Sequence, residues 1–130
     1  MAVAIAVLVF TLFKVTAGAE KQARSFLTAT LKGDTARAYA DAAPVFREST
    51  NQEQLQGEVD FLKPMQGAKV SNTGRSVSAV SGSPTRAAVS YKLDTAGTTL
   101  YVRVLLEKIG GKWKVVGFAH SDQPLSTELK

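Results

Sequence analysis

The sequence predicts an α+β protein in which an N-terminal hydrophobic helix precedes helices packed on a curled antiparallel sheet. Three observations predict this class. An uncharged apolar run opens the chain, apolar residues then recur at helical spacing, and from Ala68 onward they alternate as in strands. We expect two regions, with residues 1–19 as a hydrophobic membrane anchor and residues 20–130 as a single domain.

The anchor is predicted from the first thirteen residues, MAVAIAVLVFTLF, which carry no charge. As a helix they extend for roughly 20 Å, which is short for a span that needs about 20 residues. A cleaved signal peptide is the alternative, because Ala17-Gly18-Ala19 forms a small-residue site, but no Lys or Arg precedes the run. We favour a retained anchor in which Lys14 lies at the interface. The anchor residues are Val3, Ile5, Val7, Leu8, Val9, Phe10, Leu12 and Phe13.

Three helices are expected after the anchor. Residues 20–32 carry one apolar stripe, and Gly33 and Asp34 supply a C-terminal cap and the N-cap of the next helix. The second helix, 35–42, is rich in Ala and is expected to stop at Pro44. Thr50 and Glu53 have capping-box spacing, which predicts the start of a third helix with an apolar stripe formed by Leu55, Val59 and Leu62.

Five strands are expected in the second half, over residues 68–75, 77–80, 86–93, 98–109 and 112–120. Gly110-Gly111 indicates a two-residue hairpin, and residues 94–97 are expected to form another loop. These loops would pair Leu93 with Thr98, and Val104 with Gly117. Because side chains alternate between faces, one face then forms the core. Its residues are Ala87, Val89, Tyr91, Leu93, Leu100, Val102, Val104, Leu106, Trp113 and Val115.

The opposite face of the sheet is expected to carry an unusual number of apolar side chains beside basic ones. A contiguous apolar patch on a sheet face marks a contact surface, unless a segment of the chain folds back and covers it. Both explanations remain open at this point. The predicted partner-binding residues are Tyr101, Arg103, Leu105, Val116, Phe118 and His120.

Catalytic, metal and cofactor sites are not expected. The chain has no Cys and a single His, so it offers no zinc set and no serine triad, and Gly-rich phosphate motifs are missing. The net charge of +5 is spread along the sequence without a basic stripe that contains aromatic readers. We therefore expect no nucleic-acid partner and only a weak attraction to anionic lipid headgroups.

Residues 21–121 resemble the cystatin-like cones of the nuclear transport factor two-like superfamily. The matching pieces are Phe26-Leu27, Gly33-Asp34 and Tyr39 among the helices, and GGKWKV at residues 110–115. This resemblance implies helices held in a curled sheet, a pattern typical of bacterial envelope domains behind one membrane helix. Enzymatic members use Asp or His residues inside the cone. Here His120 is expected outside it, so no enzyme is predicted.

The main hypothesis is a non-enzymatic, membrane-tethered accessory or scaffold subunit of a bacterial envelope complex. Its domain would lie on the periplasmic side of the inner membrane and bind other membrane or envelope proteins, or copies of itself. One alternative is a pilin-like extracellular filament subunit, with residues 1–31 as a rod in the fibre core, although no acidic residue lies near position 5. The second alternative is a cone that binds a small ligand.

Overall fold

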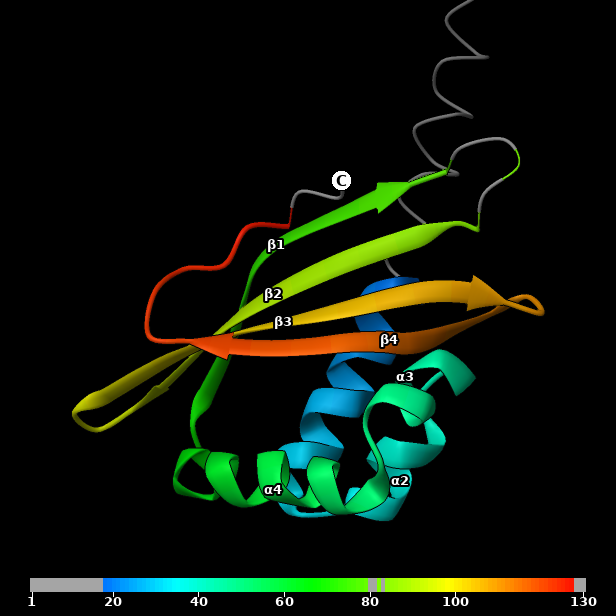
Figure 1. Cartoon of the computed structure of the whole chain (residues 1–130). Helices are drawn as coiled ribbons and strands as arrows, with labels where there is room; N and C mark the ends of the chain where they lie inside the picture. Colours follow the sequence, from blue (N-terminus) through cyan, green and yellow to red (C-terminus); the bar gives the residue numbers. More distant parts are fainter. Residues whose placement is uncertain (1–17, 80–81, 83, 128–130) are drawn as a thin grey trace, which may run out of the picture.

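The chain folds with its helices packed on one face of an antiparallel sheet, as the computed structural model shows for residues 18–79, 82 and 84–127 (Figure 1). The α+β class is therefore confirmed, and the sheet is open rather than closed into a barrel. The predicted anchor residues, from Val3 to Phe13, lie outside the described residues.

The helical part begins with a helix that is described over residues 18–32. Three α-helices follow, which are α2 (Thr35–Ala40), α3 (Pro44–Ser49) and α4 (Gln52–Leu62), and a 3-10 turn, η1 (Lys63–Met65), ends this part. The cap predictions at the first junction are confirmed. Gly33 has a positive φ of 81°, and the side chain of Asp34 accepts a hydrogen bond from the Arg37 backbone N–H at 3.2 Å.

The helices differ from the prediction in three respects. The helix α2 ends at Ala40 rather than at residue 42, and α3 is a helix that was not expected. Pro44 lies between two helices and is the first residue of α3. Proline is tolerated at this position because an N–H there would have no partner within the helix. The capping box lies one residue later than expected. Asn51 and Gln54 exchange the two bonds at 2.8 Å each, and Thr50 instead ends α3.

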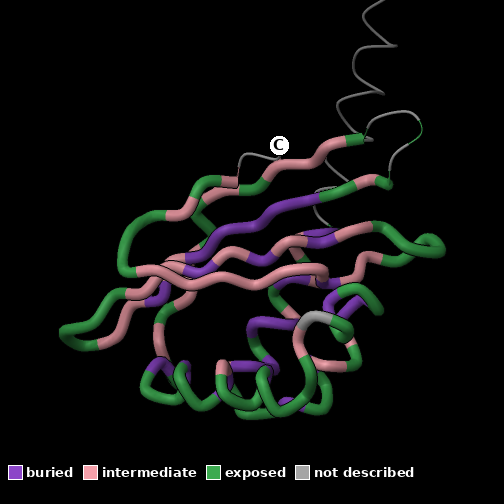
Figure 2. The backbone as a smooth tube through the Cα atoms, viewed as in Figure 1, coloured by how far each residue is buried: buried purple, intermediate pink, exposed green. Residues whose placement is uncertain are grey.

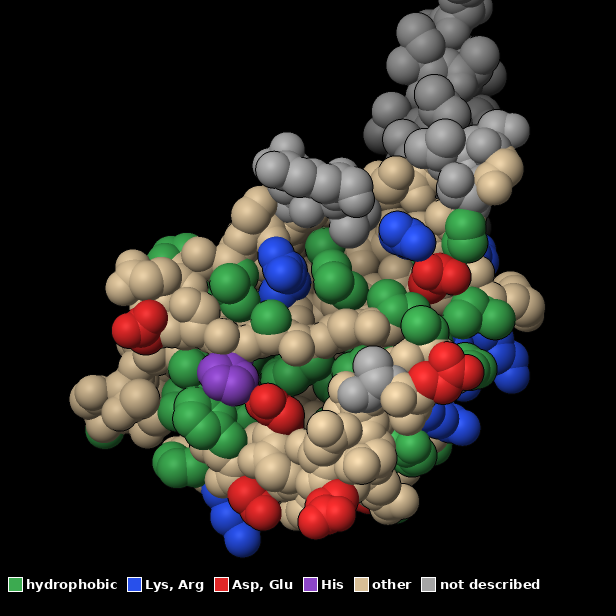
Figure 3. All heavy atoms as spheres, in the orientation of Figure 1, with side chains coloured by type: hydrophobic (Ala, Val, Ile, Leu, Met, Phe, Trp, Pro, Cys, Tyr) green, Lys and Arg blue, Asp and Glu red, His purple; other side chains and the backbone are tan. Residues whose placement is uncertain are grey.

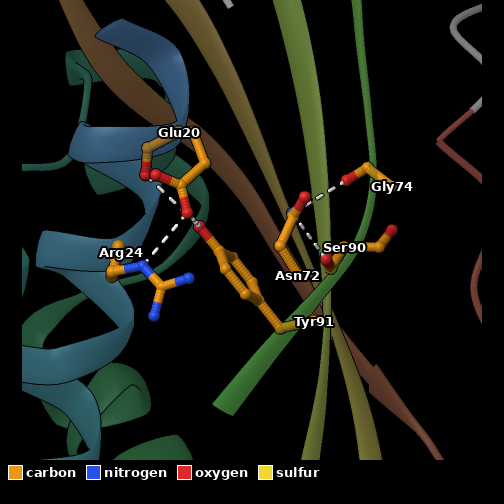
Figure 4. Close-up of polar contacts among 6 residues, drawn as sticks. All are labelled: Glu20, Arg24, Asn72, Gly74, Ser90 and Tyr91. Atoms are coloured by element: carbon orange, nitrogen blue, oxygen red, sulfur yellow. Dashed lines mark hydrogen bonds and ion pairs between the residues drawn. The ribbon is translucent and has the colours of Figure 1, made fainter. Parts of the chain in front are cut away.

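The sheet is a meander of four strands, β1 (Lys69–Ser78), β2 (Arg86–Thr95), β3 (Thr98–Ile109) and β4 (Lys112–Ser121), in the order β1-β2-β3-β4. The two short strands predicted around residue 76 are one strand. It contains a bulge at Thr73, where Asn72 Nδ2 donates to the carbonyl oxygens of Gly74 at 3.2 Å and Ser90 at 3.0 Å (Figure 4).

The core lies between the helices and the concave face of the sheet, and β2 is its most buried strand (Figure 2). Eight of the ten predicted core positions are fully buried, and Leu100 and Trp113 are half-buried against them. Large side chains fill the space. The fully buried ones include Tyr91, Phe26, Leu27, Leu55, Leu62, Leu93 and Leu106.

The β2–β3 pairing is displaced by two residues from the prediction. The turn has two residues, Ala96 and Gly97, so Leu93 pairs with Leu100 rather than with Thr98. Gly97 has a φ of 82°, as such a tight turn requires. Because side chains repeat every two residues, this even displacement leaves every residue on its predicted face.

The β3–β4 pairing is displaced by one residue, and this displacement does change faces. The hairpin starts as predicted, with Leu106 opposite Val115, but Leu105 then pairs with Gly117 and leaves Val116 as an extra residue. The predicted pair of Val104 with Gly117 is therefore wrong. Beyond this bulge, Phe118 lies opposite Val104 and points toward the helices.

A polar contact fixes the start of helix 18–32 to the sheet (Figure 4). The Tyr91 hydroxyl donates to the Glu20 backbone oxygen and lies equally close, at 3.3 Å, to its carboxylate. Arg24 Nε is 3.0 Å from the same carboxylate, and its guanidinium lies 5.3 Å from the centre of the Tyr91 ring. Burial, and then the negative charge of Glu20, raise the pKa of Tyr91 well above its ordinary value.

Candidate functional site

The bulge in β4 divides the six predicted partner-binding residues between two faces of the sheet. Tyr101, Arg103 and Leu105 lie on the outer face as predicted. Phe118 and His120 were expected beside them, but they pair with Val104 and Val102 and face the helices. Val116 is the bulged residue itself. The structure therefore does not bring the six residues together on one surface.

The outer face is partly covered by the chain's own C-terminal segment, residues 122–127. Ser90 Oγ donates to the Leu125 carbonyl at 3.2 Å, and Arg103 Nη1 donates to the Ser126 carbonyl at 3.1 Å. Ser76 Oγ donates to the Thr127 carbonyl. This cover accounts for the burial of Ser90, a polar residue that points away from the helices. Of the two explanations for an apolar outer face, covering by the chain itself therefore holds for part of it.

His120 is the centre of a second cluster, on the helix side of β4. Its ring stacks on that of Phe61 with centroids 4.3 Å apart, and its Nδ1 lies 3.1 Å from Glu58 Oε2. Phe61 is nevertheless 54% exposed, which is unusual for a large apolar side chain. Figure 3 shows the histidine among hydrophobic side chains with an acidic side chain beside it. An aromatic surface with one carboxylate is therefore open to contact.

A cleft of about 180 Å³ lies beside this cluster, between the helices and β4. Phe118 forms part of its wall and packs on Phe26 behind it, with ring centroids 5.5 Å apart. Glu58 Oε2 is buried there, and His120 Nδ1 lies 3.1 Å from it. The lining residues are Phe46, Thr50, Gln54, Leu55, Glu58 and Phe118. This cleft can receive a small apolar side chain or a hydrogen-bond donor.

The backbone of β4 adds a third feature, because this strand lies at the edge of the sheet. Chain segment 41–43 covers part of that edge, where the Val115 N–H donates to Asp41 and its carbonyl accepts from Ala43. Residues 116–121, VGFAHS, have no strand on the side away from β3 among the described residues, and they carry no Lys, Arg, Asp, Glu or Pro. Such an edge is a template for pairing with another strand.

We call residues 116–121 together with Glu58 and Phe61 the β4 edge site. Sequence reasoning missed Glu58 and Phe61. A signal for Phe61 existed, because it lies off the apolar stripe of Leu55, Val59 and Leu62. An aromatic side chain outside the buried stripe of a helix needs a neighbour elsewhere. Glu58 offered no comparable signal, since exposed carboxylates are common on helices.

Titratable groups that could hold a metal do not cluster in the described part of the chain. Among residues 18–79, 82 and 84–127, no helix has both the length and the apolar character that crossing a membrane requires. No protein family and no curated protein matches this sequence.

Proposed function

We propose that this protein is a non-enzymatic accessory or scaffold subunit, tethered to a bacterial inner membrane by its N-terminal apolar segment, with its domain on the periplasmic side. The uncharged run of thirteen residues supports the tether if Lys14 lies at the interface and residues 15–19 lengthen the helix beyond it. The finer architecture that we propose is a cystatin-like cone whose interior is filled by its own side chains. Tyr91 and Phe26 occupy that interior, which favours binding on the surface over a ligand inside.

The observation that carries the binding role is the part of the β4 edge, residues 116–121, that segment 41–43 leaves uncovered. Natural sheets protect exposed edges with charges, prolines, bulges or covering segments. The opposite edge, β1, has Lys69 and Arg75 along its length, whereas residues 116–121 have neither charge nor proline and rely on the bulge alone. An edge that is left open in this way fits the addition of a strand from a partner protein.

The partner that fits this edge is an extended segment of a membrane or envelope protein, or of a second copy of the chain. Backbone hydrogen bonds to β4 would supply much of the affinity, as in other cases of strand addition. An apolar or aromatic side chain of that segment would contact the exposed Phe61–His120 stack, because large rigid side chains dominate such contacts.

Amide hydrogen exchange on the full chain in mild detergent, alone and with its native co-purifying partner, tests the proposal. We expect protection of residues 116–121 to rise in the complex, while protection of β1 stays the same. Unchanged exchange at 116–121 in a complex that still forms would contradict binding at this edge.

Two exposed apolar residues provide a matched pair of variants. Phe61→Ala removes the aromatic beside the edge and should weaken partner binding about 5- to 30-fold, a loss of roughly 1–2 kcal/mol. Val45→Ala is the control, because Val45 in α3 is equally exposed, at 56%, but lies outside the β4 edge site. Equal losses in the two variants would place the contact elsewhere.

A further inference from the structure

Six of the sixteen Lys and Arg side chains line a groove that no partner described above uses. Two adjoining depressions, of about 520 and 720 Å³, share Lys21, Ser25 and Arg37 as lining residues. Figure 3 shows Lys and Arg side chains along the edge of the molecule beside the β3–β4 hairpin. We call this surface the basic groove, and its cationic residues are Lys21, Arg24, Lys32, Arg37, Lys112 and Lys114.

Local structure explains why these cations come together. Arg24 lies three residues after Lys21, and Lys32 lies eight residues after Arg24. Residues three or four apart lie on the same side of a helix, and eight residues are two such steps, so the three side chains share one side of helix 18–32. Lys112 and Lys114 are two residues apart at the start of β4 and share one side of the strand. Scattered positions in the sequence thus form one surface in the fold.

The groove keeps an excess of positive charge. Its three acidic residues have partners within the fold: Glu20 contacts Arg24, Asp34 caps α2, and Asp41 Oδ2 accepts a hydrogen bond from Ser25 at 3.4 Å. Six cations therefore face three carboxylates. Residues 44–65, in contrast, contain two cations and four carboxylates, so the charge of the domain is polarised.

The sole tryptophan of the chain lies in the same groove. Trp113 is half-buried, its Nε1 would lie 3.4 Å from a Cβ placed on Gly18, and Lys108 Nζ is 5.9 Å from its ring centre. Tryptophan beside Lys and Arg is the side-chain combination that membrane–water interfaces favour. The groove thus combines an interfacial aromatic with cations.

The position of the groove along the chain indicates its ligand. Gly18 lines it, and only residues 14–17 separate Gly18 from the apolar run that ends at Phe13. Even fully extended, that connection covers only about 17 Å. The contact of Glu20 with Tyr91 fixes this end of the helix to the sheet. If the apolar run enters a membrane, the groove is therefore held next to the headgroups.

We propose that the basic groove binds the anionic headgroups of the membrane that holds the N-terminal segment. The domain then lies with helix 18–32 and the β3–β4 hairpin against the lipid, instead of extending away on its tether. This inference rests on the proposed tether for its geometry, and it leaves the β4 edge site for a protein partner. Each Lys or Arg near an anionic surface strengthens binding about fivefold.

Fluorescence of Trp113 in the full chain tests the proposal directly. The chain is reconstituted in phosphatidylcholine vesicles with or without one third phosphatidylglycerol, with bromine labels placed on the acyl chains near the headgroups. We expect quenching of Trp113 only in the phosphatidylglycerol vesicles, and its loss in 0.5 M salt because salt screens charge. Equal quenching in both vesicles, or none in vesicles that carry the chain, would overturn the proposal.

Two double variants of identical charge change separate the groove from net charge. Lys21→Glu with Lys32→Glu alters two exposed groove residues and should reduce the phosphatidylglycerol-dependent quenching at least tenfold. Lys63→Glu with Lys69→Glu, also exposed but outside the groove, should retain it. Equal loss in both would mean that net charge alone attracts the protein. Binding to a short duplex DNA that is tighter than binding to the phosphatidylglycerol vesicles at the same salt concentration would instead identify a nucleic acid as the ligand.

Flotation of the same samples distinguishes failure of the proposed tether from failure of the proposed headgroup site in the basic groove. A chain that does not float with pure phosphatidylcholine vesicles lacks the tether, which contradicts the proposed function. Quenching by phosphatidylglycerol vesicles still tests the groove in that case. A chain that floats with both vesicles but shows no lipid-dependent quenching contradicts the groove alone.

Discussion

At the scale of single residues, Tyr91 links the core to the helix that emerges from the N-terminal segment. Its ring is fully buried, while its hydroxyl reaches the Glu20 backbone and carboxylate at the start of helix 18–32. A buried phenol next to a carboxylate is costly to ionise, because the phenolate would lose hydration and face a negative charge. The folded protein therefore retains the proton at a pH where an unfolded chain releases it.

This difference predicts how stability depends on alkaline pH. Unfolded tyrosine has a pKa of about 10, and the folded pKa of Tyr91 lies higher. Below pH 10 both states are protonated and the contribution to stability is complete. Above pH 10 only the unfolded state loses the proton, so the free energy of unfolding falls as pH rises.

The variant Tyr91→Phe should lower stability by about 1 kcal/mol at pH 7, through the lost hydrogen bond, and should weaken the decline above pH 10. Urea unfolding between pH 8 and 11 measures both effects. Tyr101→Phe, on the other side of the sheet, serves as the control and should keep the original slope. A Tyr91→Phe slope equal to that of the unmodified chain would exclude Tyr91 as its source.

At the scale of elements, hairpin turns and bulges decide which predictions succeed. Periodicity identified helix 18–32, α2, α4 and the last three strands, because each buries one stripe or one face. The predicted β2–β3 register is wrong by two residues, but the predicted core is unaffected, because Leu93 and Val102 still lie on the face that packs against the helices. The β3–β4 register was wrong by one residue, and this error moved Phe118 and His120 to the other face. Gly117 is a bulge signal inside the strand pattern, but a lone glycine does not specify that an extra residue precedes it, so the candidate site is only partly predictable.

The bulge makes a prediction about deletions. In the observed pairing Val116 has no partner in β3, so deleting it joins Val115 to Gly117 and leaves Phe118 opposite Val104. We expect the deletion variant to fold with a loss of about 1 kcal/mol, which lowers the melting temperature by roughly 4–8 °C. In a regular ladder, the same deletion would move Phe118 to the other face and unfold the domain.

Deletion of Ala88 provides the comparison in a strand where no bulge occurs at that position. Ala88 pairs with Leu105 on one side and Ser76 on the other, and its removal reverses the faces of one half of β2. This variant should not fold. Circular dichroism and thermal melts of the two deletions in parallel decide whether Val116 is an extra residue.

At the scale of the whole molecule, the C-terminal segment acts as a cover for the outer face of the sheet. Three side chains from β1, β2 and β3 donate to three consecutive carbonyls, those of Leu125, Ser126 and Thr127. Ending the chain at Asp122 should therefore cost about 2 kcal/mol, from bonds worth roughly 0.5–1.5 kcal/mol each. Thermal melting should show a decrease of roughly 10 °C. An unchanged melting temperature would mean that the segment lies on the sheet without stabilising it.

The proposed tether predicts that the domain folds without the segment that precedes it but depends on that segment to bind membranes. The described residues form a contiguous core, with helix 18–32 fixed by Tyr91 and its buried residues packed against the sheet. Deleting residues 1–14 should therefore leave a domain that melts cooperatively near the temperature of the full chain but no longer floats with phosphatidylcholine vesicles. Residual, salt-sensitive flotation with phosphatidylglycerol vesicles should remain, because the basic groove is intact. A truncated chain that fails to fold would show that residues 1–14 contribute to the core, and the tether would then be the wrong account of the apolar run.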